Sequence, residues 1–321
     1  MPPMIRVENL VKRFGRTTAL DRVGFTAAAG TVVGVLGPNG AGKTTVVRIL
    51  ATLVRPDDGL VQVGGLDVTR EPARVRALLG LTGQYASVDG DLTGTENLVL
   101  FGRLLGLSRP VARDRAAELL ERFELGTAAT RPAATYSGGM RRRLDLAASL
   151  VGRPRVLCLD EPTTGLDPHV RRELWQVVRE LVAEGVTVLL TTQYLEEADR
   201  LADRVTVFDA GRVVADDSPA ELKRRIGART VQVRPAIAED LDATARVLAK
   251  LTGVTPTRDA GTGLLTAPAA DPMVLSTLVR ELDRAGLAVA ELALRLPSLD
   301  EVFLALTGKP ALPTAHEGGA R

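Results

Sequence analysis

One stretch of the sequence has residue types and spacing that predict phosphate chemistry. Residues 37–45 fit the pattern G-x-x-x-x-G-K-[ST], whose glycines let the backbone wrap closely around phosphate oxygens. Lys43 adds a cation, and the Thr44 hydroxyl can ligate Mg²⁺. A glycine turn without a ligand is the alternative, but the stretch lies between a strand-like run and a helical pattern, as the motif requires. The predicted nucleoside triphosphate site comprises Gly37, Pro38, Asn39, Gly40, Ala41, Gly42, Lys43, Thr44 and Thr45.

Two adjacent carboxylates, Asp160 and Glu161, close an apolar run that begins at Val156. In a phosphate-loop enzyme, the first acid holds Mg²⁺ through its water shell, and the second orients and deprotonates the attacking water. Carboxylates that cap a strand can also be solvated turn residues. Because these two follow a phosphate loop, the catalytic interpretation is favoured.

Other residues stand where a nucleotide would meet the ends of predicted elements. Gln84 follows a predicted strand, at the carboxyl end where ligands bind in open α/β sheets. Ser137 is a good N-cap for the next predicted helix, and Gly138 and Gly139 permit close backbone approach. Phe14 could stack on an adenine face or plug a space between strands, and by itself it leaves both interpretations open.

The elements that must position these residues alternate between strands and helices, which predicts an α/β fold. Strands are expected at residues 4–8, 22–27, 31–36, 60–63, 79–83, 155–160, 186–190 and 205–208. Helices are expected at residues 44–53, 72–79, 95–105, 111–123, 137–150, 169–184 and 195–202. Pro110 interrupts the pattern between two of these helices, in what we interpret as an inserted helical region.

The composition shifts near Gly227, where we expect a second domain to begin. Strands near 230–233, 253–257, 264–267 and 287–295, with helices at 239–251 and 272–285, predict a small β-α-β-β-α-β, ferredoxin-like unit. The expected domains are residues 1–227 and 228–308. Residues 309–321, rich in Gly, Ala and Pro, are predicted to be a disordered tail.

Composition limits the classes of function. The chain has 321 residues, 45% of them hydrophobic, and a formal net charge of +2, so no strong field for a nucleic acid or other polyanion is implied. Its single cysteine, Cys158, lies in an apolar run and is expected in the core of a protein from a reducing cytoplasm. We find neither a signal peptide pattern nor a run long enough to span a membrane.

Together these motifs resemble those of an ATP-binding cassette (ABC) ATPase over residues 4–225. The resemblance is carried by Gly37 to Thr45, Gln84, Ser137-Gly138-Gly139, Asp160-Glu161 and Gly165-Leu166-Asp167. The Ser-Gly-Gly helix start before the carboxylates distinguishes this family from ordinary phosphate-loop enzymes, which lack it. The implied fold is a P-loop NTPase of the ABC type with a helical subdomain at about residues 90–150, and the implied cofactors are ATP and Mg²⁺.

The resemblance also implies a head-to-tail homodimer that sandwiches two ATP molecules. Each ATP is held by the phosphate loop of one subunit and, in trans, by Ser137, Gly138, Gly139 and Asp167 of the other. A capped helix N-terminus is a second anion site that one compact chain has no reason to build away from its own phosphate loop. By resemblance, Asp167 couples the two sites, Phe14 stacks on adenine, and Gln84 links Mg²⁺ and water to a membrane partner.

Two residues depart from the pattern of the family. Met140 stands where the family usually has glutamine after Ser-Gly-Gly, which leaves the anion-binding backbone intact. Gln193 stands where the family usually has the histidine that contacts the γ-phosphate. An amide can donate a hydrogen bond there but cannot titrate.

Two further stretches resemble the daunorubicin-resistance group of drug-exporter ATPase subunits. They are residues 296–308, LPSLDEVFLALTG, and residues 192–199, TQYLEEAD. The first would physically be an amphipathic helix that docks the small domain. The resemblance implies an ATPase on the cytoplasmic side of the cell membrane that works with a separate permease to export a hydrophobic, anthracycline-like drug or antibiotic.

Two alternatives stay open. The nearest is an ABC ATPase that exports a lipid or polysaccharide precursor. The other, from a different class, is a nucleotide-switched binding protein with slow turnover, for which Gln193 is the only indication and against which Glu161 speaks.

Overall fold

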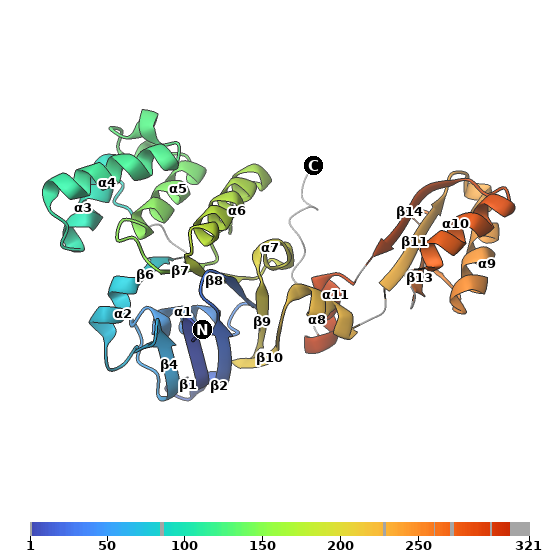
Figure 1. Ribbon diagram of the computed structural model, residues 1–321, viewed down its shortest axis with the longest axis horizontal. Helices are drawn as coiled ribbons and strands as arrows, with labels where there is room; N and C mark the ends of the chain where they lie inside the picture. Colours follow the sequence, from blue (N-terminus) through green and yellow to red (C-terminus); the bar gives the residue numbers. More distant parts are fainter. Residues whose placement is uncertain are drawn as a thin grey trace. The chain divides into compact units, whose positions relative to one another are not determined.

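A computed structural model of the protein describes residues 2–83, 87–226, 229–259, 261–269, 273–295 and 297–308 (Figure 1). The chain divides into two compact units, one ending at Pro219 and the other beginning at Ala220. The boundary that composition suggests at residue 227 stays a prediction, and residues 227, 228 and 309–321 lie outside the described residues.

A mainly parallel sheet forms the centre of the first unit, in the order β10-β9-β3-β8-β7-β6. Successive residues of its strands enter two different cores: Val33 and Val35 face one, whereas Val32 faces the other. Burial of both faces explains the near-continuous apolar runs in the sequence. The strands are β3 (Val32–Leu36), β6 (Leu79–Thr82), β7 (Val156–Asp160), β8 (Thr187–Thr192), β9 (Arg204–Asp209) and β10 (Arg212–Asp217).

An antiparallel sheet, ordered β2-β1-β4-β5, closes the first core over helix α1 (Lys43–Leu50). Its strands are β1 (Ile5–Phe14), β2 (Thr17–Ala27), β4 (Asp58–Val63) and β5 (Leu66–Asp67). The first two are longer than predicted, because their pairing continues until Phe14 faces Thr17 and leaves only Gly15 and Arg16 in the turn. Residues 12–14 are therefore part of β1.

Helices cover the second core on the other face of the parallel sheet. The inserted region contributes α3 (Gly94–Leu104), α4 (Arg109–Arg122), two single turns at Gly126–Ala128 and Ala133–Thr135, and α5 (Gly138–Ser149). Thr93 and Glu96 form a capping box that begins α3. The two helices predicted on either side of Pro110 are present as α3 and α4, but Pro110 lies in the first turn of α4, where its missing N–H costs no helical hydrogen bond.

The remaining helices of the first unit connect the strands: α2 (Pro72–Leu78), α6 (Pro168–Ala183) and α7 (Leu195–Leu201). Cys158 is fully buried in β7, and burial raises the pKa of its thiol to about 12. It is therefore an inert core residue, as expected.

The second unit has the predicted β-α-β-β-α-β order, and its sheet order β12-β13-β11-β14 is that of a ferredoxin-like domain. Its elements are α8 (Pro219–Ile226), β11 (Arg229–Pro235), a turn at Ala238–Asp240, α9 (Leu241–Thr252), β12 (Thr257–Arg258), β13 (Leu265–Ala269), α10 (Val274–Arg284), β14 (Val289–Arg295) and α11 (Leu299–Thr307). Helices α9 and α10 share its core with the sheet (Figure 1). The strand predicted at residues 253–257 is wrong in its bounds, because Gly253 ends α9 in a left-handed conformation.

Candidate nucleotide-binding and catalytic site

The phosphate loop connects the end of β3 to the start of α1. Gly42 caps the helix with φ of 104°, a left-handed conformation that favours glycine. A side chain at Gly37 would place its Cβ 2.5 Å from the carbonyl oxygen of Phe208. No side chain of the described residues caps α1, so its first N–H groups stay available to an anion.

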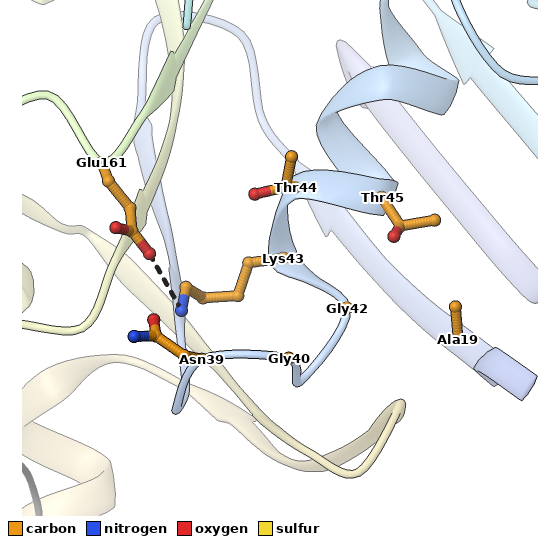
Figure 2. A pocket seen from close by; sticks show the side chains of 8 residues that line it. All are labelled: Ala19, Asn39, Gly40, Gly42, Lys43, Thr44, Thr45 and Glu161. Carbon is orange, nitrogen blue, oxygen red and sulfur yellow. Dashed lines mark ion pairs between the residues drawn. The ribbon is translucent and has the colours of Figure 1, made fainter. Parts of the chain in front are cut away.

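Lys43 is almost fully buried beneath this loop. Its Nζ donates to the carbonyl oxygens of Gly37, at 2.8 Å, and Pro38, at 3.1 Å. It also lies 3.2 Å from Oε1 of Glu161, which Figure 2 shows reaching toward it from the opposite side of the pocket. The cation of the loop is thus held by its own backbone and by the carboxylate predicted to be the base.

A cavity of about 370 Å³ opens at the loop and has a size ordinary for a small-molecule site. The described residues that line it are Ala19, Asn39, Gly40, Gly42, Lys43, Thr44, Thr45 and Glu161 (Figure 2). All but Ala19 and Glu161 belong to the predicted loop. Ala19 was missed, since an alanine on β2 carries no sequence signal for a site.

Asp160 lies beside the hydroxyl predicted to share Mg²⁺ with it. Thr44 Oγ1 donates to Asp160 Oδ1 at 3.2 Å, and Thr191 Oγ1 donates to the same oxygen at 2.6 Å. A loop threonine and a strand-end aspartate are the pair that holds Mg²⁺ in phosphate-loop enzymes, so the donor set fits that ion. The role of Thr191 in orienting Asp160 depends on the pairing of β7 with β8 and was not predicted.

Glu161 has a strained backbone. Its φ is 49°, in the left-handed region, which costs a residue other than glycine on the order of 1–3 kcal/mol. The N–H of Glu161 lies 3.1 Å from both the carbonyl oxygen and the hydroxyl of Thr191, and these contacts help to hold the conformation. In this conformation the carboxylate lies beside Lys43 and lines the cavity.

The Ser-Gly-Gly stretch begins helix α5. Ser137 caps α5 by accepting a hydrogen bond from the N–H of Met140, and both Ser137 and Gly138 are exposed. Gly139 packs against Val170 of α6: a Cβ there would lie 3.1 Å from the valine side chain. None of these residues is among the described residues that line the phosphate cavity.

Asp167 caps α6 and also stays outside the lining of that cavity, as far as the described residues define it. Backbone hydrogen bonds from Val170 and His169 hold its pKa below the ordinary 3.8. The contact of Gly139 with Val170 brings the start of α5 next to the first turn of α6. Asp167 and the Ser-Gly-Gly residues therefore lie near each other, and none of them is a described lining residue of the cavity at Lys43.

The remaining predicted site residues are Gln193, Phe14 and Gln84. Gln193 directly follows β8, and its Oε1 is buried without a hydrogen-bond partner among the described residues. Phe14, at the end of β1, is 51% exposed, and Lys12 Nζ lies 5.2 Å from its ring centre. This exposure does not fit a hydrophobic plug between strands. Phe14 is also not among the described residues that line the cavity. Gln84 lies outside the described residues.

Comparisons with known proteins agree with this geometry. Residues 20–164 match the family model described as ABC transporter, and residues 218–307 match the C-terminal domain of DrrA1-3-like ATP-binding proteins. The chain is 53% identical over 316 residues to the daunorubicin/doxorubicin resistance ATP-binding protein DrrA of Streptomyces peucetius, covering 98% of this chain and 96% of that one. It is 41% identical over 309 residues to the Nod factor export ATP-binding protein I of Ralstonia nicotianae, covering 96% and 94%.

Among solved structures, it resembles the dimeric post-hydrolysis state of the ATP-binding cassette MJ0796 bound to ADP and Pi. The TM-score is 0.62 with 26% identity, covering 67% of this chain and 98% of that one. The part of this chain that matches the ABC transporter model, residues 20–164, contains the phosphate loop, the two carboxylates and the Ser-Gly-Gly helix start. The similarity to DrrA extends through the second unit. The chain therefore belongs to the nucleotide-binding ATPase subunits of ABC transporters, within the group that has a DrrA-like C-terminal domain.

Proposed function

We propose that this ATPase drives the export of a hydrophobic, anthracycline-like drug or antibiotic through a separate membrane permease. The observation that carries the catalytic part is the convergence of Lys43, Thr44, Asp160 and Glu161 on one cavity or its immediate edge. The drug is inferred from the 53% identity to a daunorubicin/doxorubicin resistance protein over 98% of the chain.

The ion pair of Lys43 with Glu161 suggests how the site changes when ATP enters. The phosphates would take the place of Glu161 as the partner of Lys43 and would meet the free N–H groups of α1. Glu161, released from the lysine, would then take the proton of the attacking water. Thr44 and Asp160 would hold Mg²⁺, which supplies charge neutralisation at the β- and γ-phosphates.

We propose that Ser137, Gly138, Gly139 and Asp167 act on the ATP of a second copy of this chain. The support is that Ser137 and Gly138 are exposed and that none of the four is a described lining residue of the chain's own cavity. Gln193 would contact the γ-phosphate, Phe14 the adenine, and Gln84 would link the site to the permease. A homodimer would place two complete sites at the cytoplasmic face of the permease.

A mixture of two inactive variants tests the composite site. Lys43→Ala removes the loop cation, and Ser137→Arg blocks the helix start. In trans, one site of the mixed dimer contains both defects and the other contains neither, so the mixture should hydrolyse ATP although each variant alone does not. If both variants fold and dimerise but the mixture stays inactive, the composite site is wrong.

Transport by the reconstituted complex tests the cargo. Membrane vesicles that contain this subunit and its permease should accumulate doxorubicin in an ATP-dependent manner, and Glu161→Gln should abolish the accumulation. The 41% identity to a Nod factor export protein supports the alternative, a lipid or polysaccharide-precursor exporter. Vesicles that transport a lipo-oligosaccharide but not doxorubicin would favour that alternative. Hydrolysis too slow to support either cargo would favour a nucleotide-switched binding protein.

A further inference from the structure

Arg142, on helix α5, connects this helix to the loops that follow two strands of the central sheet. Its Nε donates to the carbonyl oxygen of Pro162 at 2.9 Å, and its Nη1 donates to the carbonyl oxygen of Gly83 at 2.8 Å. Pro162 directly follows Glu161, and Gly83 directly follows β6. The planar guanidinium can hold two separate carbonyl groups in a fixed relation, which a lysine ammonium does less well.

Asp145, one turn further along α5, lies beside the guanidinium of Arg142. Its Oδ2 lies 3.4 Å from Arg142 Nη1, and its Oδ1 accepts a hydrogen bond from the N–H of Ser87 at 2.6 Å. The side chains are 11% and 1% exposed, respectively. Burial lowers the pKa of Arg142, and the carboxylate of Asp145 opposes that shift.

The position of Pro162 gives this pair its significance. Glu161 has a left-handed backbone conformation, and such a conformation persists only when the surroundings determine it. Thr191 holds the N–H of Glu161, whereas Arg142 holds the next peptide carbonyl. The base is thus fixed on one side by the sheet and on the other by the helix that begins at Ser137.

We propose that Arg142, oriented by Asp145, is a positioning residue that ties the Ser-Gly-Gly helix to the backbone of Glu161. The inference rests on the proposed roles of Ser137 and Glu161. A helix that meets the partner's ATP through its N-terminus would, through Arg142, set the position of the base that acts on the chain's own ATP. The contact would couple the two sites of the dimer.

The double variant Arg142→Met/Asp145→Asn separates positioning from stability. It removes both buried charges and keeps an acceptor for the N–H of Ser87, and replacing a buried ion pair is often neutral for stability. We expect a melting temperature near that of wild type and a KM for ATP changed by less than about threefold. The value of kcat should fall on the order of 10- to 100-fold, because a small misplacement of a reacting group has effects of that size.

Two further variants keep the test decisive. Arg142→Lys preserves the charge beside Asp145 but loses the planar guanidinium that reaches two carbonyl groups at once, so the protein should stay stable while kcat falls. This variant decides the question if the double variant does not fold. Arg122→Gln breaks an exposed bidentate pair with Glu184 and should leave kcat unchanged. Folded Arg142 variants with wild-type kcat would overturn the proposal. Glu161→Gln is measured alongside to distinguish the two failures. If it retains turnover, the proposed base itself has failed; if it loses turnover while folded Arg142 variants keep the wild-type kcat, only the positioning role has failed.

Discussion

Replacing Glu161 by glutamine should tighten nucleotide binding and slow hydrolysis at the same time. In the structure, an oxygen of the Glu161 carboxylate lies 3.2 Å from Lys43 Nζ, the cation that the proposed mechanism assigns to the phosphates of ATP. The carboxylate and the phosphates therefore compete for one cation. Glutamine removes the competing charge and also removes a negative group that would face the γ-phosphate.

The size of the effect follows from the geometry of the pair. Two unit charges 3.2 Å apart attract each other by about 5 kcal/mol at an effective dielectric constant of about 20. Desolvation of both buried groups offsets most of this attraction, and Lys43 also keeps the carbonyl oxygens of Gly37 and Pro38. A net competition of about 1–2 kcal/mol corresponds to roughly 5- to 30-fold tighter binding. Loss of a positioned base should lower kcat by about 10²- to 10⁴-fold.

Binding is measured by calorimetry with a non-hydrolysable ATP analogue, and turnover is measured by steady-state phosphate release. Glu184→Gln, which neutralises an exposed glutamate in the same unit, is the matched control and should change neither quantity. Binding that is unchanged or weaker in a folded Glu161→Gln protein would refute the competition. A kcat within a factor of a few of wild type would remove Glu161 from the role of base.

Other consequences can be checked independently. Gln193→His should add a titrating limb to the turnover profile between about pH 5 and 8, and Gln193→Ala should lower turnover; an alanine variant equal to wild type at every pH would show that the side chain does not reach the phosphate. Gly37→Ala should destabilise the protein by about 1–3 kcal/mol in thermal unfolding and weaken nucleotide binding, because the new Cβ would lie 2.5 Å from the carbonyl oxygen of Phe208. Gly126→Ala, whose Cβ would meet no atom within 4 Å, serves as the control. Burial raises the pKa of Glu197 above the ordinary 4.5, so the folded protein holds this proton more tightly than the unfolded chain, and stability is lost as pH rises from the ordinary pKa through the raised one. Glu197→Gln should remove this loss, so its melting temperature relative to wild type should rise as the pH increases above 4.5, and a difference that is constant with pH would contradict the reasoning. Removing residues 228–321 should leave ATP binding intact, and a truncated protein that is folded but no longer binds ATP would contradict the two-domain assignment.

The sequence alone was sufficient for the features that depend on local spacing. The loop from Gly37 to Thr45 was placed correctly because a buried strand, a glycine turn and a helix follow each other without interruption. Asp160 and Glu161 were placed at a strand end because they close a continuous apolar run, and periodicity predicted the β-α-β-β-α-β order of the second unit. The bounds of β1 and β12 were less accurate, because strand pairing and the left-handed turn at Gly253 determine them.

Contacts between side chains from distant parts of the chain were decided only by the tertiary structure. Nothing near Lys43 in the sequence indicates that its ammonium group rests against Glu161, and nothing near Arg142 indicates that it holds the carbonyl oxygen of Pro162. Thr191 orients Asp160 only because β7 and β8 pair in a register that sets these two residues side by side. Sequence spacing determines which groups stand at the ends of elements, whereas strand register and helix packing determine which of those groups meet.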